Sequence, residues 1–204
     1  ETQLKNTPKE HFLKDITTLI DKATFTYVRQ KYMLGLGDAI LSGEPLIGNE
    51  PFAVLLADDL CVNENSNVLS EMLNLYKKHK CSIVAIEEVS IKETFKYGII
   101  NGSLISNTKD LYMVHDMVEK PDPKNSPSNL GIIGRYILTP DIFNILRQMK
   151  LKQKGELQIT DALSYQAKKT KVLAYKFKGK RFDCGDIKGY VEATNFFAKS
   201  KGLI

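Results

Sequence analysis

The 204-residue sequence has no tryptophan, only three cysteines and three histidines, and no long hydrophobic run. Cys61, Cys81 and Cys184 are too few and too scattered for a disulfide framework, and no Cys-x-x-Cys pair occurs. His11 and His115 lie far apart in the sequence and away from the cysteines, which argues against a zinc site. Neither a disulfide-rich secreted protein nor a zinc protein is therefore expected.

Segments that would place the chain in a membrane or export it are also missing. The longest apolar run, residues 52–57, is far too short to span a bilayer. Residues 1–5 have neither the basic start nor the apolar stretch of a signal peptide. We therefore expect a cytoplasmic protein without a membrane partner.

The positive charge of the chain, +5 at pH 7, is spread along the sequence. Only residues 168–171 and 176–181 are densely basic, and solvated helix ends and turns explain such stretches. A nucleic-acid-binding protein would need a longer basic stripe or a recognisable reading motif, so no nucleic-acid partner is expected. A modest positive charge equally suits small anionic ligands such as nucleotides and sugar phosphates.

The order of apolar segments indicates one α/β domain over residues 1–204. Residues 52–56 form a continuous apolar run, as expected for a parallel strand covered on both faces. A helical pattern over residues 67–79 and a strand over 82–89 follow, and this alternation implies a mostly parallel sheet. The second half is more antiparallel in pattern, with an Asn-Gly turn at residues 101–102. The other expected elements are helices over residues 8–22, 140–149, 155–169 and 187–199, and strands over residues 24–29, 114–119, 131–138 and 172–177.

A few polar residues and glycines stand where ligands bind in α/β proteins, at the carboxyl ends of strands. Asp58 follows the buried run and could hold Mg²⁺, or it could cap the next turn. Asp183 could act similarly or be an ordinary turn aspartate. Lys120 ends a strand and could reach a phosphate as a point charge, or be a solvated lysine. Gly35 and Gly37 could let the backbone approach a nucleotide, or simply form a turn.

Seven motifs occur in an order and at spacings that resemble the bacterial UTP–glucose-1-phosphate uridylyltransferases. The resemblance covers the chain from about Leu4 and implies a Rossmann-like, three-layer α/β/α nucleotidyltransferase fold with a mixed, mostly parallel sheet. The motifs are Val28-Arg29-Gln30 with Gly35-Leu36-Gly37-Asp38-Ala39, Leu55-Leu56-Ala57-Asp58-Asp59, Tyr97-Gly98-Ile99-Ile100, Val118-Glu119-Lys120-Pro121, the stretch from Ser128 to Tyr136, the stretch from Gly155 to Ala162, and Phe182-Asp183-Cys184-Gly185.

The resemblance also implies how a nucleotide would bind. Gln30 and the backbone at Gly35 would contact the uracil edge, and Asp58 and Asp183 would share a Mg²⁺ that bridges the nucleotide phosphates. The implied reaction is in-line attack of glucose-1-phosphate on the α-phosphorus of UTP, which releases pyrophosphate and leaves UDP-glucose. Asp58 and Lys120 would be the catalytic residues, because the metal and the lysine spread the charge of the transition state.

For the sugar, the resemblance implies that Gly98 and Glu119 hydrogen-bond the hydroxyl groups and that Lys120 holds the phosphate. Members of the family are commonly oligomers, so a homo-oligomer is expected. A thymidylyltransferase of the same fold is one alternative, since a single methyl group separates substrates by only about 10–200-fold. A non-catalytic fragment that binds sugar nucleotides or serves in assembly is the other.

Two departures from the family pattern stand out. Asp38 replaces a histidine that the family usually has. The Gly-x-Gly-Thr-Arg loop and the strand before it, which come first in the family and hold the triphosphate, are not in the sequence. We therefore expect the domain to be N-terminally incomplete, with two exposed strand edges, and this chain alone to be inactive.

Overall fold

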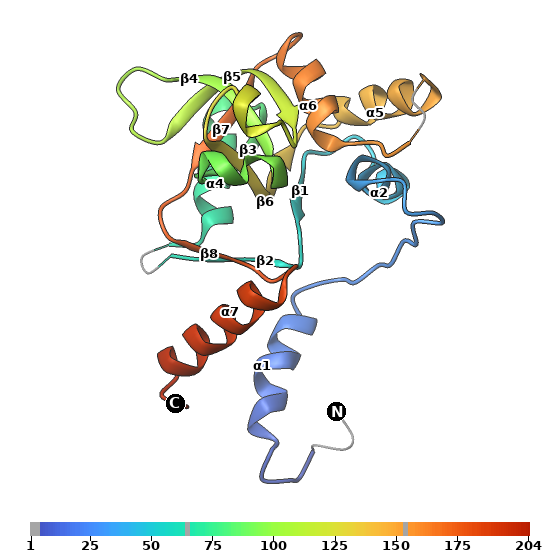
Figure 1. Cartoon of the computed structure of the whole chain (residues 1–204). Coiled ribbons are helices and arrows are strands. Elements are labelled where there is room, and N and C mark those ends of the chain that lie inside the picture. The colour runs from blue at the N-terminus through green and yellow to red at the C-terminus, as the bar shows by residue number, and fades with distance from the viewer. Residues whose placement is uncertain (1–4, 64–65, 153–154) are drawn as a thin grey trace. The chain divides into compact units, whose positions relative to one another are not determined.

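The computed structural model describes residues 5–63, 66–152 and 155–204, and Figure 1 labels most of their helices and strands. The chain divides into two compact units, residues 1–31 and residues 32–204. The first unit contains helix α1 (His11–Ile20), which begins three residues later than the sequence predicts. The strand predicted over residues 24–29 is wrong, because this segment has no regular structure. A strand needs a neighbour for its backbone groups, and no described strand pairs with this segment.

The second unit is built on a six-stranded sheet, within the described residues, in the order β1-β6-β3-β7-β5-β4. Strands β2 and β8 form a separate two-stranded sheet. The strands are β1 (Phe52–Leu55), β2 (Asp59–Val62), β3 (Ser82–Glu88), β4 (Gly98–Leu104), β5 (Leu111–Glu119), β6 (Leu130–Leu138), β7 (Val172–Lys176) and β8 (Lys180–Asp183). The helices of this unit are α2 (Leu36–Ser42), α3 (Glu44–Ile47), α4 (Val68–His79), α5 (Asp141–Lys152), α6 (Ile159–Ala167) and α7 (Ile187–Ser200), with short 3₁₀ turns at Ile91–Lys96 and Pro123–Asn125.

The predicted three layers are confirmed by two separate hydrophobic cores, one on each face of the sheet. Alternate residues of β3 point to opposite faces, as pleating requires. Val84 and Ile86 join the core beneath α2, α5 and α6, whereas Ile83 and Ala85 join the core beneath α4. No helix in the part of the chain that the structure describes is long and apolar enough to cross a membrane.

The sheet is mixed, as predicted, but it is not mostly parallel. Among the described strands only β3 and β7 pair in parallel; the other pairings of the large sheet are antiparallel. The reason is β6, which lies between β1 and β3 and runs antiparallel to both. Its apolar sequence indicates burial on both faces, which is typical of parallel strands but does not determine the direction of a strand.

Strand β1 also differs from its prediction as a strand covered on both faces. Its residues alternate between partly buried and exposed, and Leu55 is 51% exposed. Within the described sheet β1 is an edge strand that pairs only with β6. The apolar run of residues 52–56 therefore does not correspond to a strand that is buried on both faces.

The turn predicted at Asn101-Gly102 is wrong, because both residues lie inside β4. The pairing of β4 with β5 shifts register at this point. A Cβ atom at Gly102 would lie 2.6 Å from the carbonyl oxygen of Met113, so glycine is needed for the close approach of the two backbones. A glycine inside a strand marks such an irregularity as well as it marks a turn.

Candidate functional site

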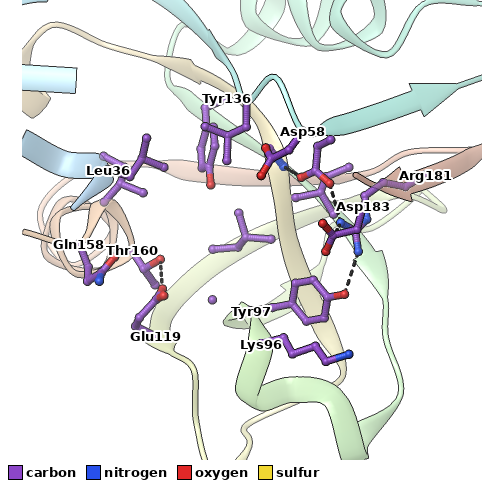
Figure 2. Close-up of a pocket in the computed structure, with 17 residues that line it drawn as sticks. Leu36, Asp58, Lys96, Tyr97, Glu119, Tyr136, Gln158, Thr160, Arg181 and Asp183 are labelled. Atoms are coloured by element: carbon purple, nitrogen blue, oxygen red, sulfur yellow. Dashed lines mark hydrogen bonds and ion pairs between the residues drawn. The ribbon is translucent and has the colours of Figure 1, made fainter. Parts of the chain in front are cut away.

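A pocket of about 200 Å³ opens beside the ends of several strands, and most of the residues that line it belong to the seven motifs (Figure 2). Asp58 and Asp183 lie at one end of it, and Glu119 and Thr160 at the other. The residues that line it are Leu36, Leu56, Asp58, Asp59, Lys96, Tyr97, Gly98, Glu119, Ile132, Ile133, Gly134, Tyr136, Gln158, Ile159, Thr160, Arg181 and Asp183.

Asp58 and Asp183 converge although 124 positions separate them in the sequence. The residue after Asp58 pairs with Asp183 across the β2–β8 ladder, and the N–H of Cys184 donates to the carbonyl oxygen of Asp58 at 2.7 Å. A Cβ atom placed on Gly185 would lie 3.0 Å from Asp183 Oδ1 and 3.2 Å from Asp58 Oδ2. The two carboxylates therefore face one small region of space.

The adjacent aspartate, Asp59, has a structural role, because it holds the turn in place through two hydrogen bonds. It is buried; its Oδ2 accepts from the N–H of Gly134 at 2.6 Å, and its Oδ1 accepts from Arg181 at 2.5 Å. A Cβ atom at Gly134 would lie only 2.7 Å from Asp59 Oδ2, so the contact requires glycine at 134. Asp58 is exposed and its carboxylate has no hydrogen-bond partner among the described residues. The pair thus divides into one carboxylate that anchors the turn and one that faces solvent.

Arg181 lies at the centre of a buried polar cluster, with its side chain 7% exposed. Besides Asp59, its guanidinium donates to Glu87 at 2.5 Å and to the Tyr97 hydroxyl at 2.9 Å, and it lies 3.5 Å from Asp183 Oδ2. Burial alone would lower the pKa of Arg181. The hydrogen bond to Asp59 and the charges of Asp59 and Glu87 outweigh burial and raise this pKa above its usual value, so the guanidinium stays charged.

A second arginine supports the same turn through backbone groups. Arg135 donates to the carbonyl oxygens of Leu56 at 2.9 Å, Gly134 at 2.7 Å and Asp59 at 2.5 Å. The carbonyl groups of Leu56 and Asp59 lie on either side of Asp58 in the sequence. Arg135 therefore fixes the backbone that carries the exposed carboxylate.

The other end of the pocket is formed by Gly98, Glu119 and Thr160. Gly98 and Glu119 are partners across the β4–β5 ladder, and Thr160 comes from the first turn of α6. The Thr160 hydroxyl donates to Glu119 Oε2 at 2.7 Å, which orients the carboxylate. A Cβ atom at Gly98 would lie 2.7 Å from Thr160 Oγ1 and 3.2 Å from Glu119 Oε2. This end can accept hydrogen bonds from a polyhydroxy ligand.

Lys120 follows β5 directly and stands beside the pocket, although its side chain is not part of the lining. Its backbone is left-handed, with φ 45°, which is uncommon for a residue other than glycine. Its N–H donates to the carbonyl oxygen of Tyr97 at 2.9 Å, and its Nζ lies 4.0 Å from Glu119 Oε1. The backbone thus fixes where the side chain starts, while the side chain as a whole remains more than half exposed.

Two predicted ligand contacts are not among the pocket residues. Gln30 belongs to the first unit, so its contact with a base stays a prediction. Gly35 has φ 91°, and a Cβ atom there would lie 2.8 Å from the carbonyl oxygen of Leu157, so this glycine serves a close backbone approach. Asp38, the residue that departs from the family pattern, is buried and pairs with Lys150 at 2.5 Å.

Arg181, Thr160 and the structural role of Asp59 were not predicted from the sequence. Arg181 and Asp183 are two residues apart in β8, so they share one face of the strand; this spacing is the one signal that could have linked them. Thr160 lies in the motif from Gly155 to Ala162, but the helical pattern does not reveal which strand it contacts. Both contacts depend on how distant elements pack together.

The donor set at Asp58 and Asp183 fits Mg²⁺. Among the described residues there is no group of three or more His, Cys, Asp or Glu that could hold a metal ion on its own. Mg²⁺ is commonly bound through one or two carboxylates together with substrate phosphates and water, rather than by a cage of protein ligands. Two convergent carboxylate oxygens at the mouth of a pocket match this pattern.

Comparison with known proteins agrees with this geometry. Residues 4–200 match the nucleotidyl transferase family. The chain is 60% identical over 197 residues to a UTP–glucose-1-phosphate uridylyltransferase of Pseudomonas aeruginosa, covering 96% of this chain and 70% of that protein. A crystal structure of a UDP-glucose pyrophosphorylase complexed with UDP-glucose is similar with a TM-score of 0.89 at 56% identity, over 94% of this chain and 72% of that chain.

A more distant similarity extends to a putative glucose-1-phosphate thymidylyltransferase from Bacillus anthracis. Its TM-score is 0.69 at 22% identity, over 90% of this chain and 71% of that chain, which shows the fold alone. The uridylyltransferase similarity is far stronger and extends over nearly the whole chain. The chain therefore belongs to the UTP–glucose-1-phosphate uridylyltransferase family, a family of nucleotidyl-transferring enzymes.

Proposed function

We propose that this protein transfers a uridylyl group from UTP to glucose-1-phosphate, which gives UDP-glucose and pyrophosphate. The observation that carries the proposal is the division of the pocket. Convergent carboxylates, Asp58 and Asp183, occupy one end, and an oriented acceptor for hydroxyl groups, Glu119, occupies the other. Family membership supports the same assignment.

In this proposal the residues bind and orient two anions. Asp58 and Asp183, which line one end of the pocket, would hold Mg²⁺, and Glu119 with the backbone at Gly98 would bind the sugar hydroxyls at the other end. Lys120 holds the sugar phosphate as a point charge. When bound, Mg²⁺ neutralises phosphate charge and polarises the phosphoryl group that is attacked.

No protein nucleophile is needed, because the phosphate oxygen of glucose-1-phosphate is itself the attacking group. Catalysis of such a transfer consists mainly of positioning and electrostatic stabilisation. Gln30 and the backbone at Gly35 are proposed to contact the uracil. That the molecule acts in the cytoplasm, as one domain and as a homo-oligomer, also belongs to this proposal.

The proposal is tested first by binding. Calorimetric titration of UDP-glucose with and without Mg²⁺ should show tighter binding with the metal, and Asp58→Asn or Asp183→Asn should remove the difference. Asp110→Asn is the matched control, since Asp110 pairs with Lys178 at 3.3 Å and does not line the pocket. A Mg²⁺ effect that survives in both site variants would contradict the assigned metal ligands.

Turnover is the second test. The chain is extended by the glycine-rich loop segment of the family, and pyrophosphate release from UTP and glucose-1-phosphate is measured. We expect release that depends on Mg²⁺, and a clear preference for UTP over dTTP. Sugar-nucleotide binding without any release in the extended chain would instead support the non-catalytic alternative.

A further inference from the structure

Arg181 contacts polar side chains from four separate segments, and both ends of the pocket depend on these segments. Asp59 is in β2, Asp183 is in β8, Glu87 is in β3, and Tyr97 directly follows the 3₁₀ turn. We infer that Arg181 is a positioning residue that aligns the metal-binding carboxylates with the sugar end of the pocket. This inference rests on the proposed function of the same site.

At the metal end, Arg181 determines which oxygen of Asp183 is available. The guanidinium lies 3.5 Å from Asp183 Oδ2, whereas Asp183 Oδ1 faces the region beside Gly185 that Asp58 Oδ2 also faces. The N–H of Gly185 donates to Oδ1 at 3.1 Å and holds the carboxylate from the other side. With Oδ2 held by the arginine, Oδ1 is directed toward Asp58. Without this contact the carboxylate could rotate about its last side-chain bond.

The same guanidinium orients Asp183 relative to Asp58 through the backbone. Its bond to Asp59 fixes the residue that follows Asp58 and pairs with Asp183 across the β2–β8 ladder. Glu87 at 2.5 Å ties the guanidinium to β3 of the large sheet, so Arg181 links the two-stranded sheet to the main core in addition to the bonds from Gly134 and Arg135 to Asp59. The position of both carboxylates therefore depends on Arg181.

At the sugar end, the link runs through Tyr97. The tyrosine hydroxyl accepts from Arg181 at 2.9 Å, and the guanidinium carbon lies 5.1 Å from the centre of the ring. The carbonyl oxygen of Tyr97 accepts from the N–H of Lys120 at 2.9 Å, and Gly98 is the next residue. A shift of Tyr97 would therefore move the backbone that carries both Gly98 and Lys120.

Lysine cannot replace arginine in this arrangement. The guanidinium is a planar fork with five donors, and here it serves four side chains in different directions. The ammonium group of lysine is a point charge with three donors at the end of a flexible stem. Arg181→Lys keeps the charge but leaves part of the cluster without its donor.

The decisive measurement is the affinity for Mn²⁺ in the presence of UDP-glucose, determined by electron paramagnetic resonance. Removal of a group that orients a metal ligand typically weakens metal binding by about 10–100-fold, and we expect this loss for Arg181→Lys. Arg147→Lys is the control, since this exposed arginine pairs with Glu44 outside the pocket, and its Mn²⁺ affinity should be unchanged. In an Asp183→Asn background Arg181→Lys should cause a smaller further loss than in the wild type, because the route through Asp183 is already removed and only the route through Asp59 to Asp58 remains.

The sugar half of the inference has its own variant. Tyr97→Phe keeps the ring and removes only the hydroxyl, so it should weaken glucose-1-phosphate binding while Mn²⁺ affinity stays close to that of the wild type. Unchanged glucose-1-phosphate binding in this variant would contradict the link through Tyr97.

Three outcomes separate the possible failures. A folded Arg181→Lys protein with wild-type Mn²⁺ affinity would overturn the inference. If thermal unfolding shows that Arg181→Lys is not folded, Asp59→Asn replaces it. The amide oxygen still accepts from Gly134, while the charge that holds Arg181 is removed. Unchanged Mn²⁺ affinity in Asp59→Asn would also overturn the inference. If the wild type binds no Mn²⁺ with UDP-glucose, the proposed function fails, and this inference fails with it.

Discussion

Gly98 leaves no room for even one additional methyl group. In Gly98→Ala the new Cβ atom would lie 2.7 Å from Thr160 Oγ1, and 3.2 Å from both Glu119 Oε2 and Ile132 Cδ1. Thr160 is only 4% exposed and is branched at its Cβ atom, so its hydroxyl cannot easily move away. The methyl group must therefore break the hydrogen bond from Thr160 to Glu119 or displace β4.

The cost follows from these two consequences. Overpacking a filled site costs typically about 1–3 kcal/mol. Loss of a hydrogen bond to a charged group costs about 1.5–3 kcal/mol. Because both describe the same displacement, they do not add, and we expect Gly98→Ala to lower the free energy of unfolding by about 2–3 kcal/mol. Binding of UDP-glucose should weaken too, since the orientation of Glu119 changes.

Urea denaturation measures this cost, which corresponds to a midpoint shift of about 1 M or more. In a Thr160→Ala background the closest contact is absent, so Gly98→Ala should cost at least about 1 kcal/mol less. Gly43→Ala is a control, because its φ of −81° suits alanine and its nearest contact would be 3.3 Å away. If the costs of Gly98→Ala and Thr160→Ala simply add, the steric reasoning is refuted.

Three further predictions concern binding, acid stability and thiol reactivity. Lys120→Ala should weaken sugar-phosphate binding by about 1.5–3 kcal/mol, and unchanged kinetics for both the sugar phosphate and UTP would contradict the role of Lys120 in holding the phosphate. Glu119→Gln should reduce discrimination among sugars, with less effect on binding of the nucleotide. The hydrogen bond from Ser164 holds the pKa of Asp116 below its usual 3.8. The ionised carboxylate therefore stabilises the fold fully above pH 3.8, and this contribution is lost as the pH falls through the lower pKa of the folded state. The free energy of unfolding, measured from about pH 5 to about pH 2, should fall less steeply in Ser164→Ala, and identical slopes would argue against this. Burial raises the pKa of the Cys81 thiol, so alkylation at this residue, followed by mass spectrometry, should be much slower in the native protein than in urea.

Most elements of the second unit were predicted from local patterns. The helix over residues 67–79 and the strand over 82–89 lie almost where periodicity places them, at α4 and β3. Direction and pairing were not predictable in the same way. The antiparallel insertion of β6 between β1 and β3 depends on contacts between distant segments, which no local pattern encodes.

The candidate site shows the same division. Asp58, Gly98, Glu119 and Asp183 could be named because each belongs to a motif with fixed spacing, and the structure brings them to one pocket. Arg181 could not be named, because its importance arises only when four segments converge on it. Their roles in binding and catalysis stay predictions until the variants are measured.

At Lys120 the left-handed backbone lowers the stability of the fold, whereas the lysine side chain at the same position is proposed to serve binding. For a residue with a side chain this conformation costs roughly 1–2 kcal/mol of folding free energy, whereas glycine adopts it freely. A laboratory selection for heat resistance alone would thus favour glycine at 120 and discard the ammonium group. A selection for sugar-phosphate affinity would favour lysine and tolerate the less stable fold. Screens that rank variants of this protein by melting temperature would misjudge this position.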